Sequence, residues 1–477
     1  MKRRDFLKNL GVVSAGAVVA PELAAKAPAA AESGLMDIFN PERKSAGEFN
    51  TRFPIKALKA KVSRPLKVVI IGAGNRGRTY SRYAQLFPEV MQIVGVSDIN
   101  PHRKEAMAKK FNVAPERRYG HYDELLSQEM FADAAIICTP DNLHFDPCIK
   151  ALDKGYDVIL EKPMAQTEKE CRAIYAKTKQ TGRIVAVCHV LRYAPYFLAL
   201  HDLVQSGEIG DVVSIQHMEP IAYWHMAHSY VRGNWHDSKK TTPIILAKSC
   251  HDLDIIRWIV NKPCQTIVAD GSLYLFKKEN APKGAPLRCT DGCPHEATCP
   301  FSAIDIYKRK KLMLKVFDLP DQNDENAIVE KLKTTNYGRC VFHSDNDQPD
   351  HYVCNMVFEG GITSSFTMDA FTPSGGRRTR IMGTKGFIDG DSKQFTVTYF
   401  GPENRKTWNL KVSEIAEYAH AGHGGGDLGL VRDFLEAVDK RDDSHLSSNI
   451  KVSLESHVMG FAAEKSRRSG KKEKIKI

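Results

Sequence analysis

The first half of the chain alternates short apolar runs with segments of helical length. The apolar runs lie at 67–71, 92–97, 134–139, 157–160 and 184–187. The helical segments between them lie at 106–111, 144–154 and 169–181. Strands that alternate with helices in this way are typical of a parallel sheet. The pattern therefore predicts a doubly wound α/β Rossmann domain over residues 65–190.

From about residue 212 onward, apolar and polar residues alternate with a period of two. Strands of this kind are predicted at 212–217, 266–275, 351–358, 363–371, 379–382 and 394–399. Such alternation is typical of a mostly antiparallel sheet. We expect an α+β domain with a large open sheet over 191–464, interrupted by an irregular insertion at 277–311. An arm at 32–64 precedes the first domain, and a basic tail at 465–477 follows the second.

A glycine motif follows the first apolar run directly, as Gly72-x-Gly74-x-x-Gly77. A helical segment comes next, and then a second apolar strand that ends in Asp98. This is the dinucleotide-binding fingerprint in its proper strand–turn–helix–strand setting. Gly72 permits the tight turn, Gly74 lets a pyrophosphate approach the backbone, and Gly77 lets the helix pack on the strand. The positive end of the helix would face the phosphates.

The residues around this motif also indicate which dinucleotide is bound. Asp98 is positioned to accept hydrogen bonds from a ribose 2′-hydroxyl, which favours NAD. Arg76 and Arg78 leave NADP open, because a guanidinium can accommodate a 2′-phosphate. Asn75 and Arg76, at the start of the helix, are further candidate cofactor contacts.

Two polar clusters come directly after predicted strands. The first contains Thr139, Pro140, Asn142 and His144, and the second is Glu161-Lys162-Pro163. Open α/β sheets bind their ligands at the carboxyl ends of the strands. We therefore expect the cofactor to contact Thr139, Pro140, Asn142, His144, Glu161 and Lys162.

A third cluster enters an amphipathic helix in the second half of the chain. It contains Lys248, His251, Asp252 and Asp254. Lys248 and His251 lie three residues apart, so they are expected to share one helix face.

The order of these motifs resembles that of the Gfo/Idh/MocA family, which includes glucose–fructose oxidoreductases and inositol dehydrogenases. The shared order is GxGxxG, TPxxxH, EKP, Arg192-Tyr193 after the fifth strand, and then HxxD. Segments 383–386 and 423–427 also fit. The resemblance implies a sheet domain whose open face holds a carbohydrate, a homodimer or homotetramer, and a cofactor contact from Arg192.

The resemblance also implies a mechanism. Oxidation of a secondary hydroxyl by hydride transfer requires a base for the hydroxyl proton, and histidine is suited to that task. By resemblance, His251 is the base and Lys162 polarises the hydroxyl. Aromatic and imidazole side chains before the HxxD helix suit a sugar ring. The candidate substrate contacts are Lys248, Tyr193, Trp224, His225 and Trp235.

One position departs from the family pattern. Many relatives carry an aspartate four residues before the catalytic histidine, where this chain has Ala247. A cationic Lys248 beside His251 would lower the pKa of the histidine. Either another carboxylate, from Asp252, Asp254 or Glu161, orients the imidazole, or the proton chemistry differs from simple dehydrogenation.

The N-terminus predicts export. Residues 1–31 begin with twin arginines followed by Phe-Leu-Lys and a short apolar stretch, which resembles a twin-arginine signal peptide. We expect a periplasmic or secreted protein with no stable membrane insertion once the signal is removed. Free NAD is expected to be scarce there, which favours a tightly retained cofactor.

A retained cofactor allows two enzymatic schemes and one without catalysis. The chain can oxidise a sugar hydroxyl and return the hydride to a second substrate. It can also act as a redox-neutral glycosidase or lyase through a transient 3-keto-sugar. The third reading is a non-catalytic dinucleotide-binding protein, which the loss of the aspartate at Ala247 makes reasonable.

Charge and cysteines add little to this picture. The net charge of +11 is concentrated at the ends of the chain, which leaves about +2 for the body. No basic stripe with interleaved aromatic residues predicts nucleic-acid binding, and the tail at 465–477 is expected to be solvated. The insertion carries Cys289, Cys293, His295 and Cys299, a donor set that is adequate for structural zinc. One disulfide with a spare thiol is equally open in an oxidising compartment.

Overall fold

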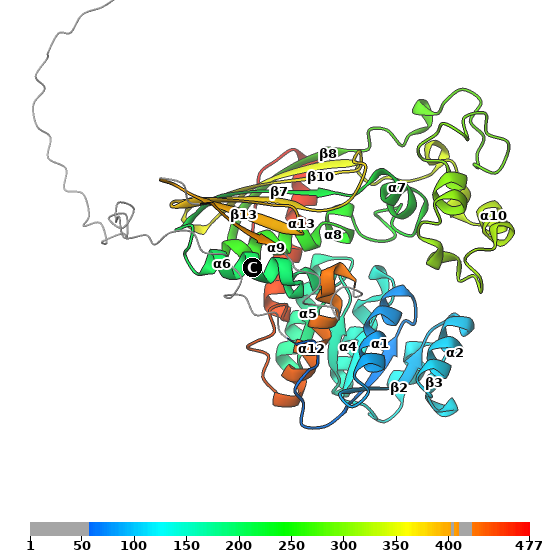
Figure 1. Ribbon diagram of the computed structural model, residues 1–477. Helices are drawn as coiled ribbons and strands as arrows, with labels where there is room; N and C mark the ends of the chain where they lie inside the picture. Colours follow the sequence, from blue (N-terminus) through cyan, green and yellow to red (C-terminus); the bar gives the residue numbers. More distant parts are fainter. Residues whose placement is uncertain (1–56, 402–404, 410–421) are drawn as a thin grey trace, which may run out of the picture. The chain divides into compact units, whose positions relative to one another are not determined.

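The computed structural model describes residues 57–401, 405–409 and 422–477 (Figure 1). The predicted signal at 1–31 and most of the predicted arm lie outside the described residues. The end of the arm packs against the first domain, with Leu58 fully buried. The backbone N–H groups of Lys61 and Ser63 donate to Glu436 and Asp439 of helix α12 (Gly426–Lys440).

A six-stranded parallel sheet forms the first domain, as the apolar runs predicted. The strand order is β3-β2-β1-β4-β5-β6. The strands are β1 (Leu66–Ile71), β2 (Met91–Ser97), β3 (Arg118–Tyr119), β4 (Ala134–Ile137), β5 (Asp157–Leu160) and β6 (Val185–Val187). Val68 and Ile70 pack in one core, whereas Val69 and Ile71 pack in another on the opposite face. Burial of both faces explains why Val68 to Ile71 are apolar without alternation.

Helices connect these strands, and polar side chains set where several of them begin. They are α1 (Asn75–Leu86), α2 (Pro101–Lys110), α3 (Tyr122–Ser127), α4 (Phe145–Lys154) and α5 (Glu168–Thr181). Helix α2 begins five residues before the predicted segment at 106–111. The Asn100 side chain caps the N–H groups of His102 and Arg103, and Pro101 fits the first helical position. Thr167 and Glu170 form a capping box at the start of α5.

A nine-stranded sheet forms the second domain, in the order β14-β13-β12-β11-β7-β10-β9-β8-β15. Its strands are β7 (Val212–Pro220), β8 (Cys264–Ser272), β9 (His351–Phe358), β10 (Thr363–Asp369), β11 (Arg378–Gly383), β12 (Gly386–Gly390), β13 (Gln394–Tyr399), β14 (Arg405–Asn409) and β15 (Glu473–Lys474). Within the described residues, β7 and β10 are the parallel neighbours of this sheet, and its other pairs are antiparallel. The predicted mostly antiparallel sheet is therefore confirmed.

Helices cover one face of this sheet. Figure 1 shows α9 (Cys250–Val260) and α13 (Ile450–Ser469) lying along it, together with α6 (Pro195–Gln205) and α8 (Ile244–Ala247). On β10, Ser364, Phe366 and Met368 are buried, while the residues between them are more exposed. This alternation is the period of two seen in the sequence.

Two segments differ from their sequence expectations. Helix α13 continues past residue 464 to Ser469, and β15 then pairs with β8, so the basic tail is part of the fold. The sequence predicted that the positive charges of the tail face solvent. Arg467 and Arg468 instead form ion pairs with Glu464. The insertion between β8 and β9 is longer than predicted and contains α10 (Glu325–Thr334). In the described part of the chain, no helix is both long enough and apolar enough to cross a membrane.

Candidate active site

The three glycines of the fingerprint differ in what surrounds them. A Cβ on Gly72 would lie 2.6 Å from the carbonyl oxygen of Cys138, and φ at Gly72 is +94°. A Cβ on Gly77 would lie 2.1 Å from the carbonyl oxygen of Gly72. At Gly74, by contrast, the nearest atom would be 3.8 Å away, on Arg103. Packing therefore requires Gly72 and Gly77, whereas Gly74 leaves open the space through which a ligand can reach the backbone.

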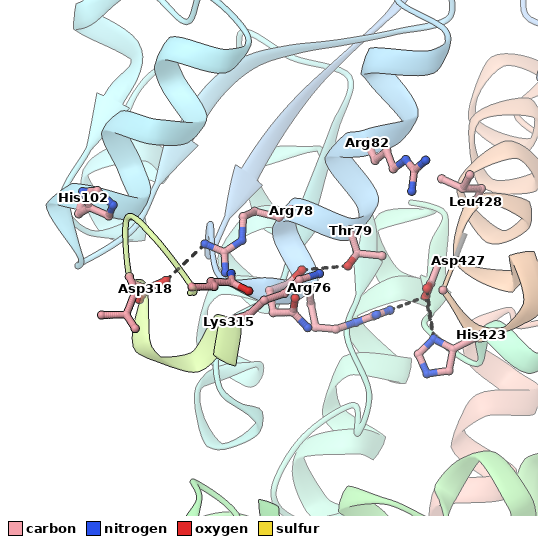
Figure 2. Close-up of a pocket in the computed structure, with 14 residues that line it drawn as sticks. Arg76, Arg78, Thr79, Arg82, His102, Lys315, Asp318, His423, Asp427 and Leu428 are labelled. Carbon is pink, nitrogen blue, oxygen red and sulfur yellow. Dashed lines mark hydrogen bonds and ion pairs between the residues drawn. The ribbon is translucent and has the colours of Figure 1, made fainter. Parts of the chain in front are cut away.

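The N-terminus of α1 is prepared for an anion. Gly74 is its N-cap, no side chain caps the helix, and the first turn carries no acidic residue. A cleft of about 740 Å³ opens in front of it (Figure 2). Its cationic lining residues are Arg76, Arg78, Arg82 and Lys315; His102, His423, Asp318 and Asp427 line it as well. The cationic groups fit the pyrophosphate of a dinucleotide, because free helical N–H groups and positive side chains converge on one space.

Asp98 lies beside this turn, at the end of β2. Its carboxylate accepts the N–H of Ala73 at 2.7 Å and the N–H of Asn100 at 2.7 Å. Both bonds fix the side chain next to the glycine turn, where the ribose of a dinucleotide is bound in this fold.

Arg76 is engaged with the protein itself. Its guanidinium pairs with Glu161 and donates to Tyr80, and it bonds the Asp427 carboxylate at 2.6 Å (Figure 2). Burial alone would raise the pKa of Glu161, but Arg76 and Lys162 hold it below the usual value. Arg76 therefore ties α1 to the segment after β5 and to α12, so any effect on the cofactor works through these partners.

Lys162 reaches from the first domain to the second. The Glu161 carboxylate accepts the backbone N–H of Lys162 at 2.8 Å, which anchors the segment after β5. The Lys162 ammonium donates to the carbonyl oxygen of Ala247 at 2.6 Å. Lys162 thus contacts Ala247 through the backbone of Ala247. This contact does not depend on the aspartate side chain that many relatives carry at that position.

His251 lies buried in the first turn of α9, close to Lys162. Its Nδ1 has no hydrogen-bond partner among the described residues. Burial lowers the pKa of His251 well below its usual value, and the charge of Lys162 lowers it further. His251 is therefore neutral near pH 7 and able to accept a proton.

None of the three carboxylates considered for the missing aspartate contacts His251. Asp252 accepts hydrogen bonds from Arg377 at 2.6 Å and His217 at 3.0 Å. Asp254 receives two bonds from Arg192, at 2.6 and 2.8 Å. The carboxylate of Glu161 is occupied by Arg76, as described above. The imidazole of His251 is thus held by burial and not by a carboxylate.

Lys248 does not share a helix face with His251. It lies between α8 and α9, and its ammonium pairs with Glu219 at 3.2 Å. Glu219 also pairs with Arg377, which in turn pairs with Asp252. This ionic cluster was missed because it joins the end of β7, the start of β11 and α9, which are distant in sequence.

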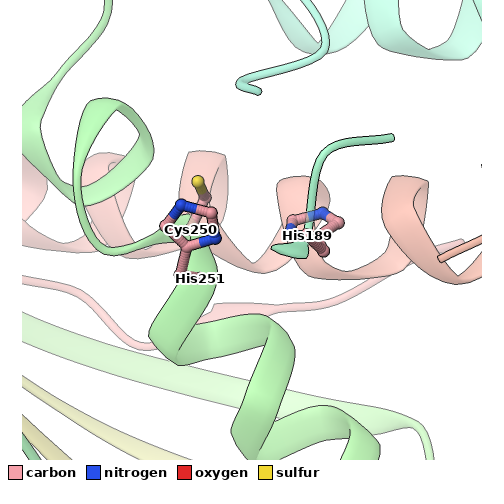
Figure 3. Close-up of side chains that lie close together, drawn as sticks. All are labelled: His189, Cys250 and His251. Carbon is pink, nitrogen blue, oxygen red and sulfur yellow. The ribbon is translucent and has the colours of Figure 1, made fainter. Parts of the chain in front are cut away.

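His189 is a further residue that the sequence did not single out. It lies shortly after β6, and its ring centroid is 6.1 Å from that of His251. Donor atoms of His189, Cys250 and His251 all lie within 4.8 Å of one another (Figure 3). Burial lowers the pKa of His189 to about 4, and its Nδ1 makes no hydrogen bond among the described residues but lies 3.7 Å from the Asp254 carboxylate. His189 therefore places a second buried imidazole beside His251. The sequence signal that could have identified His189 is its position as a polar residue just after β6, a parallel strand.

Several predicted cofactor and substrate residues have structural contacts instead. Both ring nitrogens of His144 bond carbonyl oxygens, of Pro163 at 2.7 Å and Thr139 at 2.8 Å, so His144 positions the two loops. Arg192 is buried, and its guanidinium donates to Asp254 and to the Ser447 carbonyl. These bonds hold the segment after β6 against α9, and the cofactor contact expected of Arg192 stays a prediction.

Tyr193 also has a structural contact. It is buried and its hydroxyl bonds Ser448 at 2.7 Å, and its expected contact with the substrate stays a prediction. Pro140 and Asn142 are exposed at the strand edge, and Thr139 is half-buried. Trp224 and Trp235 are half-buried, and Trp224 stacks on His225 with centroids 5.5 Å apart. Burial lowers the pKa of His225, and Lys248 lowers it further.

The candidate zinc ligands do not converge as a tight set. No three of the donors of Cys289, Cys293, His295 and Cys299 lie within 4.8 Å of one another in the described residues. The Nε2 of His295 bonds the Lys283 carbonyl at 2.9 Å. The three cysteines do line one cavity, together with Cys340 from further along the chain.

A Rossmann domain with an anion-binding turn, joined to an open-sheet domain that meets it at a lysine and a histidine, defines a dinucleotide-dependent oxidoreductase. The chain belongs to the Gfo/Idh/MocA oxidoreductase family. Residues 66–189 match the NAD-binding Rossmann fold of that family, and residues 201–477 match its C-terminal α/β domain. NAD is the cofactor that this fold binds.

Comparison with individual proteins agrees with this assignment. YteT of Bacillus subtilis, an oxidoreductase by name, is 26% identical over 396 residues, which cover 78% of this chain and 89% of YteT. Inositol 2-dehydrogenase of Salmonella typhimurium is 27% identical over 42% of this chain, and the match spans only 56% of that enzyme. A levoglucosan dehydrogenase solved with NADH and levoglucosan has the same fold, with a TM-score of 0.65 at 16% identity over 87% of this chain and all of that one.

Proposed function

We propose that the protein oxidises a secondary hydroxyl of a sugar or polyol by transferring a hydride to NAD. The observation that carries the proposal is the half-buried Lys162 ammonium beside the buried His251, whose Nδ1 has no hydrogen-bond partner among the described residues. Bound NAD would accept the hydride, and the glycine turn with Asp98 would hold it. The sugar or polyol class rests on the names of the relatives and on the half-buried Trp224 and Trp235.

Lys162 and His251 divide the proton chemistry between them. The positive charge of Lys162 stabilises negative charge on the substrate oxygen, which makes the hydroxyl easier to deprotonate. His251 accepts the proton because it is neutral at working pH. Once protonated, His251 is a buried cation next to Lys162, so it must pass the proton on.

His423 and Asp427 supply the exit for this proton. The ring centroid of His423 is 5.9 Å from that of His251, and its Nδ1 lies 3.2 Å from the Asp427 carboxylate. The His423 side chain is 39% exposed, whereas Asp427 is buried. Because His423 reaches solvent and lies beside the Asp427 carboxylate, the two residues offer the proton a route out of the site that does not depend on the position of Ala247.

We further propose that the protein is exported and retains its cofactor through each catalytic cycle. The twin arginines at Arg3 and Arg4 support export. Denaturing the protein after purification without added nucleotide, and identifying the released molecule by mass spectrometry, tests retention. Near-stoichiometric NAD is the expected result, and an empty protein that binds NAD weakly would contradict retention.

Site variants test the reaction itself. Lys162→Met and His251→Asn should each lower kcat for hydride transfer to NAD about 10²- to 10⁴-fold, as loss of an acid–base group does. Bound nucleotide content should stay unchanged. Exposed Lys179→Met and His445→Asn are the matched controls and should retain full activity. Full activity in Lys162→Met would refute the assignment. Cleavage of a glycoside without net NADH would instead identify the redox-neutral scheme.

A further inference from the structure

The insertion between β8 and β9 reaches the cleft in front of α1. Four of its residues, Lys315, Asp318, Leu319 and Gln322, line this cleft of about 740 Å³, and α1 supplies much of the opposite lining. Figure 2 shows Asp318 joined to Arg78 of α1 by an ion pair. We call residues 315–322 the cleft segment. A ligand in the cleft is therefore enclosed by the Rossmann domain and by the insertion together.

Asp318 connects the cleft segment to the first domain. Its carboxylate accepts the Nε–H of Arg103 at 2.8 Å and lies 2.6 Å from Nη2 of the same guanidinium. It also lies 3.5 Å from Nη1 of Arg78. Because the Asp318 side chain is only 18% exposed, solvent screens these pairs less than it screens a surface pair. One carboxylate thus joins the insertion to α2 and to α1.

Arg103 links this ion pair to the glycine turn. Asp318 binds Nε and Nη2 of Arg103, whereas Nη1 is the atom nearest to the open side of Gly74, 3.8 Å from the position that a Cβ would take there. The planar guanidinium therefore presents one edge to the insertion and directs another nitrogen toward the expected position of the pyrophosphate. Asp318 acts on that position through Arg103, as a positioning residue.

The insertion itself holds the base of the cleft segment. A short 3₁₀ helix, Leu314–Phe317, leads into Asp318. The Phe317 ring is buried and packs edge-on against Tyr307 and Tyr337, with ring centroids 5.4 and 5.6 Å apart. Asp318 ends the turn with φ at +48°, which residues other than glycine rarely adopt. Aromatic packing on one side and ion pairs on the other therefore hold the segment in this conformation.

We propose that the cleft segment is a strap that holds bound NAD against α1, and that Asp318 fastens it. Lys315 lies on the cleft side, where its positive charge adds to the attraction for the pyrophosphate. For the dinucleotide to leave, the segment must part from α2, which breaks the ion pairs of Asp318. The fastening therefore slows dissociation of the cofactor. This inference rests on the proposed function, because it requires NAD to be the ligand of the cleft.

The rate at which the full chain releases NADH tests the strap. The protein is loaded with NADH, excess NAD is added, and the loss of bound-NADH fluorescence gives the dissociation rate. Asp318→Asn removes the charge and keeps the size of the side chain, so NADH should leave about tenfold faster. Asp321→Asn is the matched control, because this exposed carboxylate lies in the same segment and accepts the nearby N–H of Asn323 at 2.8 Å. Equal release rates in the two variants would overturn the proposal.

Two further variants separate positioning from folding. Asp318→Glu keeps the charge and should restore slow release, which a loss of packing alone would not. Lys315→Met changes an exposed side chain and should also speed release, so the proposal stays testable where Asp318→Asn does not fold; an unchanged rate in Lys315→Met would then overturn it. An unmodified chain that binds no NADH would contradict the proposed function and the strap with it, whereas NADH binding with equal release rates would overturn the strap alone.

Discussion

Two glycines of the fingerprint lie only three residues apart, but an added methyl group should affect stability at Gly77 and NAD affinity at Gly74. In Gly77→Ala, the new Cβ would meet the Gly72 carbonyl oxygen at 2.1 Å, so α1 must move. In Gly74→Ala, the nearest atom would be 3.8 Å away and φ is −70°, which alanine adopts without strain. Gly77→Ala should therefore lower the stability of the fold, whereas Gly74→Ala should lower the affinity for the dinucleotide.

The magnitudes follow from these contacts. Overpacking against rigid backbone costs about 1–3 kcal/mol, and the better helix propensity of alanine returns at most about 1 kcal/mol. Gly77→Ala should thus lower the free energy of unfolding by roughly 1–2 kcal/mol. At Gly74, alanine is a poorer N-cap residue than glycine, which costs about 0.5–1 kcal/mol. Alanine also reduces the conformational entropy of the unfolded chain, which stabilises the fold by about 0.4–1 kcal/mol. The free energy of unfolding should therefore stay nearly constant.

The affinity for NAD should change in the Gly74 variant. A methyl group there keeps the pyrophosphate from the helical N–H groups, and a hydrogen bond to a charged group contributes about 1.5–3 kcal/mol. NAD should therefore bind about 10- to 100-fold more weakly. Urea unfolding and calorimetric titration of NAD into nucleotide-free protein measure the two effects. Unchanged affinity in a stably folded Gly74→Ala protein would refute the placement of the phosphates.

Three further predictions concern the buried charges and imidazoles. Burial lowers the pKa of His189 and His228 to about 4 and of His457 to about 3, so below about pH 6.5 these residues take up protons only when unfolded. The free energy of unfolding by urea should consequently fall from pH 6.5 toward pH 4, and a flat profile would contradict their burial as neutral groups. The acid limb of kcat/KM should lie below pH 6.5, since neutral His251 is the active form, and an inflection above 6.5 would exclude it as the base. Asp254→Asn should destabilise the fold by about 3–5 kcal/mol, because it leaves the buried Arg192 unpaired. Exposed Asp443→Asn serves as its control, and equal unfolding curves for both variants would show that this ion pair is dispensable.

Local patterns were enough to predict the framework of the first domain. A parallel sheet covered on both faces leaves apolar runs, and the glycine motif marks a turn whose geometry depends on a few adjacent residues. For the same reason the strand ends that carry Thr139 and Lys162 could be found in the sequence. Helix α2 began earlier than expected because one capping side chain, Asn100, outweighed the apolar pattern.

The sequence by itself determined the two-domain architecture, the dinucleotide fold and the strand edges at which the candidate chemistry lies, because each is encoded within short stretches. Only the tertiary structure decided which side chains meet. It engaged Arg192 with Asp254, separated Lys248 from His251, and brought His189 and His423 to the site. It also brought Cys340 to the other three cysteines of the insertion. These contacts join segments far apart in the chain, and the period of a strand or helix carries no information on which distant residue fills the space beside it.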